Sequence, residues 1–447
     1  MRLACVGPIS PLRTGVSVFN ERLQSFLGRH CEVETFTDQT ILPPVSEEER
    51  GKAADIDLFL SNPKRFDAVL YHMGNHYRYH RRIYEALLNA PGFGLLHDCV
   101  LSHFFAKYYL ERGNFQAFRT VMETAGSKEV ESEISKFYES KADLYRFPMT
   151  GIIAKSSRGT IVMSEYGKEI VRHEAPEAKV LKISFPYFKN ADTIEPERFR
   201  KTYGIPSDHF IVTFVGHITP AKRLDVALEA FREFHARFPQ SIFLIAGESS
   251  ARLPVARSLK SGSGGIRYLG YLDRSKLDAL IAISDACINL RYPSHGEMSS
   301  TLIDMLGLGR VAVVSNYGQF AEFPDDVCIK IGLGPHEKED LAKALVGLST
   351  NRDQKERMEA NARTYIAEQH APETAAKAIM DFIKENAAAE PLLPRETSCR
   401  FLDTDPSFLR HKQAFSYNLR RIMLYAREQG LTELFKQGLR RAFPKKG

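Results

Sequence analysis

The sequence lacks the marks of secretion, of membrane insertion and of zinc binding. It contains no run of about 18 apolar residues, the length a helix needs to cross a bilayer. Its N-terminus has no apolar stretch of roughly 7–15 residues of the kind found in signal peptides. Six cysteines are scattered over the 447 residues without a C-x-x-C pair, which argues against a zinc site and for a reducing compartment. We therefore expect a cytoplasmic protein.

A charge excess is also missing from most of the chain. The net charge is +6 at pH 7, from 61 Lys and Arg against 55 Asp and Glu. Residues 401–447 hold ten basic and four acidic groups, so this segment carries the whole excess and residues 1–400 are balanced. A balanced body argues against general nucleic-acid binding, and the 43% apolar fraction argues against wholesale disorder.

Short apolar runs alternate with segments of helical period along most of the chain. In the first part, the pattern predicts strands at 3–6, 32–36, 67–71, 94–97 and 159–163, and helices near 16–27 and 81–88. In the second part, it predicts strands at 210–215, 241–246, 266–269, 286–290 and 311–315, and helices at 223–238, 274–283 and 299–308. Such alternation is typical of open parallel sheets.

The repetition of this pattern predicts two doubly wound, Rossmann-like domains of the α/β class. We expect an N-terminal domain over residues 1–190, a second domain over 191–385 and a basic helical tail over 386–447. Ligands of such sheets bind beyond the carboxyl ends of the strands, so a cleft between two facing domains is the expected binding site.

Two strand-to-helix turns are candidates for anion binding. Gly15 precedes the first helix, where backbone amides can approach an anion, although an ordinary turn explains it equally well. Gly216 opens the matching turn in the second part, followed by Lys222 and Arg223 near the next helix start. Cations are poorly placed at a helix N-terminus, so a bound phosphate is one explanation and a solvated pair is the other.

The segment 289–309 is the richest in polar groups. It follows a predicted strand and opens a helix, so its glycine and hydroxyl residues fall at a helix N-terminus. Glu297 can accept two sugar hydroxyls there, or it is only an acid favoured by the helix dipole. Asp304 is seven residues further on, which predicts that both carboxylates share one face of the helix.

Seven segments in order resemble retaining glycosyltransferases of family four (glycosyl transferases group 1), which have the GT-B architecture. The resemblance covers roughly residues 1–385 and rests on 7–17 (GPISPLRTGVS), 72–76 (HMGNH), 95–98 (LLHD), 147–171, 215–231 (VGHITPAKRLDVALEAF), 289–309 (NLRYPSHGEMSSTLIDMLGLG) and 313–327 (VVSNYGQFAEFPDDV).

The resemblance implies a donor site mainly in the second domain. Lys222 matches a lysine that contacts the nucleotide diphosphate. His217 stands where the family has an arginine, and Arg223 would compensate for the missing arginine. Asp304 would hold the ribose, and Glu297 would face the donor sugar. The further donor-side candidates are Gly15, Gly216, Arg291, Met298, Ser299, Ser300 and Thr301.

The resemblance also implies an acceptor side in the first domain. His97 resembles the histidine near the anomeric carbon, although a lone histidine at a strand end is often structural. The other acceptor-side candidates are His72, Asn75, His76 and Asp98. His97, Glu297 and Lys222 are therefore the expected catalytic residues.

The implied reaction needs no metal ion. Cations and helix-end amides stabilise the departing nucleoside diphosphate, which accepts the proton of the acceptor hydroxyl in a front-face displacement. The two D-x-D tripeptides, at 55–57 and 403–405, do not follow core strands and are taken as chance. We expect a UDP- or GDP-sugar as donor and a glycan or lipid-linked acceptor, as in the synthesis of a surface polysaccharide such as lipopolysaccharide.

Other function classes remain open at this point. The family motif that this chain resembles has two Glu eight residues apart, whereas Glu297 and Asp304 are seven apart. A non-catalytic partner subunit with a degenerate donor site would explain this difference and the presence of His217. A pyridoxal phosphate-dependent phosphorylase lacks a suitable lysine context, and a nucleic-acid binder lacks the charge.

The basic tail has two interpretations. It combines an apolar stripe at helical spacing with neighbouring arginines, and the stripe comprises Phe415, Leu419, Ile422, Met423, Leu431, Leu434, Phe435 and Leu439. Residues 401–447 either pack back on the first domain or bind the anionic inner face of a membrane.

Overall fold

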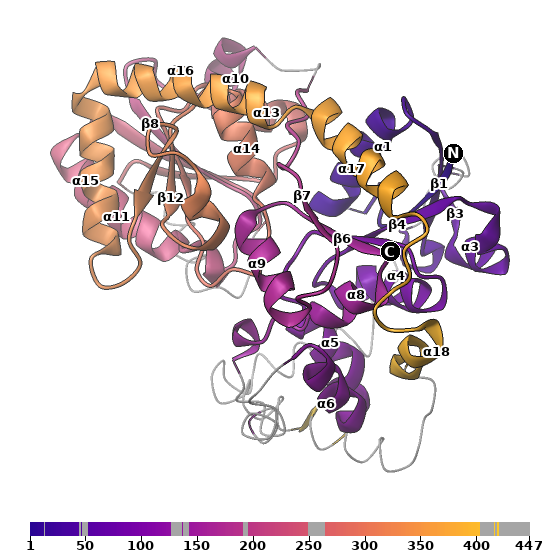
Figure 1. Ribbon diagram of the computed structural model, residues 1–447. Coiled ribbons are helices and arrows are strands. Elements are labelled where there is room, and N and C mark those ends of the chain that lie inside the picture. The colour runs from indigo at the N-terminus through magenta and orange to yellow at the C-terminus, as the bar shows by residue number, and fades with distance from the viewer. Residues whose placement is uncertain are drawn as a thin grey trace.

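Two parallel β-sheets form the centre of the molecule (Figure 1). The computed structural model describes residues 1–12, 14–43, 46, 52–126, 136, 143–190, 195–248, 264–402, 415, 418 and 419. The first sheet has seven strands in the order β3-β2-β1-β4-β5-β6-β7, and the second has six in the order β10-β9-β8-β11-β12-β13. The predicted fold of two Rossmann-like units is therefore confirmed.

The first sheet is built from residues 2–182. Its strands are β1 Arg2–Val6, β2 Glu32–Thr37, β3 Ala54–Asp55, β4 Ala68–Met73, β5 Phe93–Leu96, β6 Gly159–Val162 and β7 Val180–Lys182. Its helices are α1 Gly15–Leu27, α3 Ile56–Ser61, α4 Tyr77–Asn89, α5 Ser102–Tyr109, α6 Phe115–Thr124, α8 Gly151–Ser156 and α9 Glu165–Glu174. Short 3-10 helices are η1 Gln39–Ile41, η2 Pro63–Arg65, η3 Leu110–Arg112 and η4 Leu144–Arg146.

The second sheet begins after residue 209. Its strands are β8 Phe210–Val215, β9 Ser241–Ala246, β10 Ile266–Gly270, β11 Ala286–Asn289, β12 Ala312–Ser315 and β13 Cys328–Ile331. Its helices are α10 Pro196–Tyr203, α11 Leu224–Arg237, α13 Arg274–Ala282, α14 Ser300–Gly307, α15 Glu337–Thr350 and α16 Arg352–Gln369, with 3-10 helices η5 Pro220–Lys222 and η6 Gly318–Glu322.

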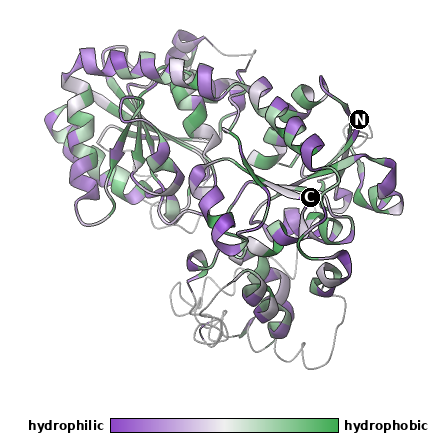
Figure 2. Ribbon diagram, viewed as in Figure 1, coloured by the Kyte–Doolittle hydropathy of each residue, from purple (hydrophilic) through white to green (hydrophobic). Residues whose placement is uncertain are grey.

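Side chains of each strand point alternately to the two sides of the sheet, and both sides are apolar. In β1, Ala4 and Val6 pack on the side of α4 and α8, whereas Leu3 and Cys5 pack on the side of α1. Successive side chains of a strand point to opposite faces, so this alternation buries both. Figure 2 shows the resulting apolar strands between more polar helices.

The chain returns to the first sheet after the second is complete. Helix α17 (Pro372–Asn386) buries Ile379 and Ile383 in the same apolar cluster as Leu23 and Leu27 of α1. Figure 1 shows the two helices side by side. The helix that closes the second domain in sequence therefore covers a face of the first.

The start of the predicted tail also packs on the first sheet. Helix α18 (Arg395–Ser398) and the 3-10 helix η7 (Cys399–Phe401) lie against α4, and the Tyr109 hydroxyl donates to the Phe401 carbonyl at 2.6 Å. Most of the apolar stripe lies outside the described residues. Of its members that the structure describes, Phe415 is 70% and Leu419 40% exposed.

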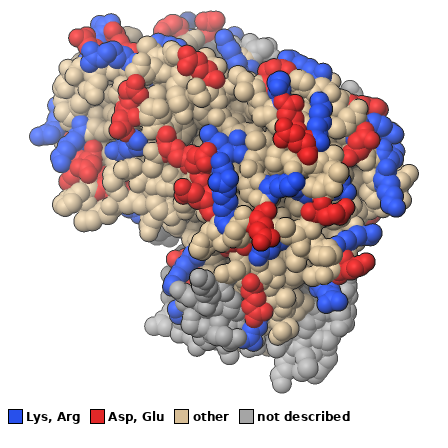
Figure 3. Space-filling model, viewed as in Figure 1, with Lys and Arg blue, Asp and Glu red and all other residues tan. Residues whose placement is uncertain are grey.

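The surface in view is a mixture of charges rather than a field of one sign. Figure 3 shows acidic and basic side chains interspersed over the part of the chain that the structure describes. Among the described helices, none combines the length and the hydropathy needed to cross a membrane.

Candidate active site

The candidate site lies where the carboxyl ends of the two sheets meet. In the first sheet, β4 leads into His72 and Met73, and β5 leads into His97 and Asp98. In the second sheet, the strand order reverses direction between β8 and β11, which end in Val215 and Asn289. Open α/β sheets bind ligands at such reversals, because loops diverge there and leave a crevice.

Two buried histidines form the floor of the first half-site. The Nδ1 atom of His72 lies 3.1 Å from Nε2 of His97, and both residues are buried. Burial lowers the pKa of His72 to about 3 and also lowers that of His97. Both rings are therefore neutral near pH 7, and one nitrogen of the pair donates to the other. Phe19 of α1 packs its ring edge-on against His97, with centroids 4.9 Å apart.

Asp98 follows His97 and is fixed by the loop after β4. Its Oδ2 atom accepts a hydrogen bond of 2.6 Å from the backbone N–H of Asn75. Asn75 Oδ1 in turn accepts from the Phe104 backbone N–H at 2.9 Å, so the Asn75 side chain ties this loop to α5. Burial, followed by repulsion from Glu297, raises the pKa of Asp98 to about 7. His76, the fourth acceptor-side candidate, is exposed and precedes α4.

Glu297 lies in a loop and not on a helix, which corrects one sequence prediction. Helix α14 begins at Ser300, and the Ser299 hydroxyl caps it by accepting from the Leu302 backbone N–H. Glu297 therefore stands before the cap, and it does not share a helix face with Asp304. The prediction failed because it extended the helical periodicity back from Ser299 over the loop that contains Glu297.

The Glu297 carboxylate is held by its own loop. Its Oε2 atom accepts from the His295 backbone N–H at 2.8 Å and from the Ser294 hydroxyl at 2.9 Å. Its Oε1 atom lies 3.1 Å from Nε of Arg291, which is buried. Gln319 of η6 donates to the Ser294 hydroxyl at 2.9 Å and so ties this loop to η6.

The same loop joins the two halves of the molecule. The His295 carbonyl accepts hydrogen bonds from the backbone N–H groups of Cys99 at 2.7 Å and Val100 at 2.8 Å. Gly296 has φ 73°, and a Cβ atom there would lie 2.8 Å from the Cys99 Cβ. Only glycine fits both the left-handed backbone and the close approach.

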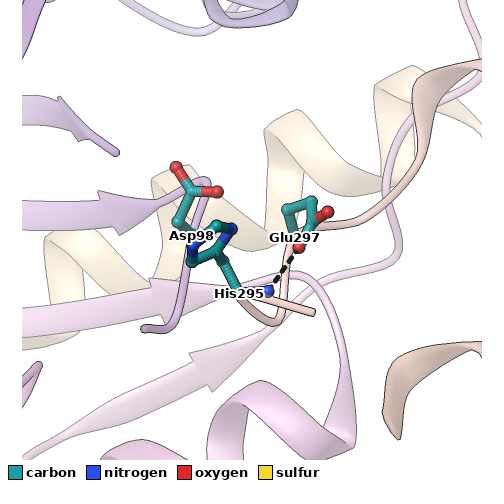
Figure 4. A group of neighbouring side chains, drawn as sticks. All are labelled: Asp98, His295 and Glu297. Carbon is teal, nitrogen blue, oxygen red and sulfur yellow. Dashed lines mark hydrogen bonds between the residues drawn. The ribbon is translucent and has the colours of Figure 1, made fainter. Parts of the chain in front are cut away.

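This contact brings Asp98, His295 and Glu297 together (Figure 4). One possible ligand atom from each residue lies within 4.8 Å of the others, so among the described residues this trio is a group with the donor types for a metal ion. Arg291 already neutralises Glu297 from the other side. The trio therefore brings together a carboxylate that follows β5 of the first sheet and one that follows β11 of the second.

Lys222 presents an ammonium group without a counter-charge. It lies against Gly216, whose φ of 118° and missing side chain make room for it. Among the described residues, no carboxylate lies within 4 Å of the ammonium nitrogen. Burial and repulsion from Arg291 lower its pKa to about 7, while Glu297 acts in the opposite direction. Tyr292 donates its backbone N–H to the Ala221 carbonyl at 2.8 Å, which holds the Arg291 loop beside this turn.

Arg223 does not join Lys222, contrary to its predicted role as a substitute for the family arginine. It has φ 53°, and its guanidinium pairs with Glu337 of α15, with Nε 3.1 Å and 3.3 Å from the two carboxylate oxygens. Glu337 is 2% exposed, so the pair is a structural one. His217 is exposed at the mouth of the turn.

Asp304 also has a partner that the sequence did not indicate. Both of its oxygens accept from Arg274 of α13 at 2.6 Å. Asp304 is buried, and burial raises its pKa although Arg274 opposes the shift. The predicted ribose contact stays a prediction, and Arg274 occupies one lone pair on each oxygen.

The remaining predicted donor residues surround the start of α14 and of α1. The Thr301 hydroxyl accepts from the Asn289 side-chain amide at 3.1 Å, Ser300 opens α14, and Met298 packs into the apolar cluster next to it. Gly15 opens α1, where Thr14 is the cap, and a Cβ at Gly15 would meet nothing within 4 Å. The close approach expected at Gly15 is thus not required by the protein itself.

Sequence reasoning missed the role of His295 and the ring cluster beside it. His295 lies 3.3 Å from His103 through ring nitrogens, and the ring of Tyr145 lies 4.4 Å from that of His295, centroid to centroid. The motif contains His295, but His103 and Tyr145 are 192 and 150 residues away in sequence, so spacing could not associate them.

A family model and known proteins match this chain. The model described as "Glycosyl transferases group 1" matches residues 195–365. An alpha-monoglucosyldiacylglycerol synthase from Acholeplasma laidlawii is 26% identical over 170 residues, which cover 37% of this chain and 42% of that protein. The chain spans about half the length of the curated relatives it matches.

Solved structures share the fold at low identity. HepE from Anabaena in complex with UDP-glucose has a TM-score of 0.59 at 12% identity, covering 86% of this chain and all of that one. WaaG, a glycosyltransferase involved in lipopolysaccharide biosynthesis, has a TM-score of 0.57 at 15% identity, covering 85% of this chain and 99% of that one. These likenesses extend over both sheets.

Proposed function

We propose that this chain, whose residues 195–365 match the family described as glycosyl transferases group 1, is an enzyme that transfers a sugar from a UDP- or GDP-sugar with retention of configuration. The observation that carries this proposal is the partly buried Lys222 ammonium, which lies near Arg291 without a carboxylate of its own. Two neighbouring cations of this kind favour a diphosphate between them. HepE, which shares the fold, has been solved with UDP-glucose.

The transfer breaks the bond between C1 of the sugar and the β-phosphate oxygen of the donor. Negative charge grows on the leaving nucleoside diphosphate, and Lys222 and Arg291 stabilise it where it forms. The acceptor oxygen bonds to C1 on the same face, and its proton passes to the leaving phosphate oxygen. Since fixed cations and amides supply the stabilisation, we propose that no metal ion is required.

Glu297 and His97 would position the sugar on either side of C1. Glu297 is already oriented by two loop donors and Arg291, so its remaining lone pairs are available to hydroxyls of the donor sugar. His97 has one ring nitrogen committed to His72, which leaves the other to face the reacting carbon. Asp98 would hold the acceptor hydroxyl close to Glu297.

The acceptor that we propose is a glycan or a lipid-linked glycan of a surface polysaccharide. The relative from Acholeplasma laidlawii is named for a product on diacylglycerol, and WaaG is a glycosyltransferase involved in lipopolysaccharide biosynthesis. The excess of basic residues after position 400 is compatible with work at the inner face of a membrane, where such acceptors are held.

A second candidate function is a non-catalytic partner subunit that keeps the fold. It is favoured by two structural pairs, because Arg223 is bound to Glu337 and Asp304 to Arg274 rather than both facing the donor. In that case the cleft would bind no nucleotide sugar.

A panel of UDP- and GDP-sugars distinguishes the two functions. Thermal unfolding in the presence of each compound is measured first, because a bound ligand raises the midpoint. Release of UDP or GDP with a glycan acceptor is measured next. We expect one nucleotide class to stabilise the chain and to support transfer; absence of both effects over the whole panel supports the partner subunit instead.

A further inference from the structure

A cavity lies at the amino ends of the strands of the first sheet, opposite the carboxyl ends that carry the candidate site. It has a volume of about 580 Å³ and is formed where β4 and β5 begin. Ala68 begins β4 and His72 is four residues further along it, and a strand rises about 3.3 Å per residue, so the cavity is roughly 13 Å from the histidine pair. We call this space the basal cavity, and its walls include Lys64, Phe66, Asp67, Arg158 and Arg395.

Three cations line the basal cavity against one carboxylate. Lys64, Arg158 and Arg395 come from η2, from the turn before β6 and from α18. Within the described residues, no carboxylate lies within 4 Å of any of the three charged groups. The wall carboxylate, Asp67, accepts from the backbone N–H of Arg2 at 2.7 Å.

Arg158 has a donor that the protein leaves unused. One of its terminal nitrogens donates to the Ala387 carbonyl, but its Nε atom is buried without any acceptor. A buried N–H without an acceptor costs free energy, typically about 1–3 kcal/mol. That Nε atom lies beneath the cavity wall, so an anion in the cavity would instead lie beside the outer part of the Arg158 guanidinium and the charged groups of Lys64 and Arg395.

The rest of the wall is apolar except for Asn89. Leu60, Pro63, Val69, Pro91 and Phe93 line the same space, and Phe66 is buried beneath it. Ligand pockets of a few hundred cubic ångströms usually combine an apolar surface with a few placed polar groups. The cavity is therefore larger than a lone anion needs, and it suits an anion attached to an apolar body.

We propose that the basal cavity binds a phosphate group attached to an apolar body. The phosphate oxygens lie among Lys64, Arg158 and Arg395, and the apolar body lies on Phe66 and Val69. Because Arg395 belongs to the segment after α17, the ligand fastens this segment to the first sheet. This site is independent of the donor site and of the transfer that we propose for the cleft.

The test uses the full chain and two matched double variants. K64Q/R395Q removes the two exposed cations of the cavity, and R198Q/K201Q removes two exposed cations from α10, far from it, with the same change of net charge. Neither variant alters a buried side chain, so both should fold, and equal thermal midpoints without ligand confirm it. Transfer activity with a soluble acceptor is expected to stay unchanged in both.

Three probes distinguish the source of the phosphate. Inorganic phosphate and dihexanoyl phosphatidic acid are titrated by calorimetry, and vesicles containing phosphatidylglycerol are tested by sedimentation. We expect saturable binding of at least one probe, weakened tenfold or more in K64Q/R395Q and unchanged in R198Q/K201Q. The probe that shows this difference identifies a free anion, a single amphiphile or a membrane surface as the source. Equal binding by the two variants for every probe, or no saturable binding at all, overturns the proposal.

Discussion

Arg274 holds the Asp304 carboxylate with two hydrogen bonds of 2.6 Å, one from each terminal nitrogen of the guanidinium. The two residues belong to α13 and α14, so the pair ties neighbouring helices of the second sheet together. Asp304 is only 5% exposed, so it depends on this partner to remain charged. An acid that the sequence resemblance assigns to the ribose therefore also has a structural partner.

Replacing Arg274 by Ala should destabilise the protein by about 3 kcal/mol, because a buried carboxylate loses its charged partner. Urea unfolding of the wild type and the variant measures this. Arg352→Ala is the control, since its i,i+4 partner Glu356 is exposed and little change is expected. If Arg274→Ala lowers the free energy of unfolding no more than the control does, the pair has no structural role.

Arg223→Ala should lower the stability of the fold without weakening the binding of the nucleotide. The substitution leaves Glu337, which is almost fully buried, without its bidentate partner, at a cost of about 3 kcal/mol. The dissociation constant for UDP or GDP should change less than threefold, because the guanidinium faces α15 and not Lys222. A tenfold loss of nucleotide affinity at unchanged stability would return Arg223 to the donor site.

Gly296→Ala should impair transfer by separating the two halves at their contact. The new Cβ would lie 2.8 Å from the Cys99 Cβ, so the hydrogen bonds to the His295 carbonyl must lengthen. We expect a fall in kcat/KM of roughly tenfold or more.

Gly204→Ala is a matched control for this variant. Gly204 also has a positive φ, 57°, but a Cβ there would meet nothing within 4 Å, so it introduces backbone strain alone. Equal losses of activity in the two variants would show that strain, and not the contact with Cys99, is responsible.

Asp98 should make stability depend on pH. Its pKa is raised to about 7 in the folded protein, from 3.8, so the folded state holds a proton that the unfolded state lacks between these values. Its contribution to stability is therefore fully present below about pH 4 and is lost as the pH rises towards 7. Asp98→Asn should remove this loss. In urea unfolding, the free energy of unfolding of the variant, relative to that of the wild type, should therefore increase from pH 5 to pH 7.5. A constant difference between the two proteins over that range would refute the shift.

The sequence predicted the elements that are long and buried. Strands β8 and β9 have the predicted limits, because FIVTFV and SIFLIA are continuous apolar runs that only a doubly covered strand accommodates. Strands β3, β7 and β13 were not predicted. They have two to four residues and are partly exposed, so they carry little periodic signal.

The sequence predicted which loops carry the candidate site residues, but it did not predict the ion pairs of those residues. The sequence predicted that His97, Lys222 and Glu297 follow the carboxyl ends of strands, and they do follow β5, β8 and β11, while their roles in the reaction stay predictions. The partners of Arg223 and Asp304 were hidden, since Glu337 is 114 residues from Arg223 and Arg274 lies on a neighbouring helix. Long-range ion pairs leave no spacing pattern in a single sequence.

The proposed transfer depends most on Lys222 as a ligand of the nucleotide diphosphate. Calorimetric titration of UDP and GDP into the wild type, Lys222→Ala and the control Lys201→Ala, which changes an exposed lysine on α10, tests it most directly. We predict that one nucleotide binds the wild type and the control alike, and binds Lys222→Ala at least tenfold more weakly. Equal affinity of all three proteins, or no binding of either nucleotide, would contradict the central claim.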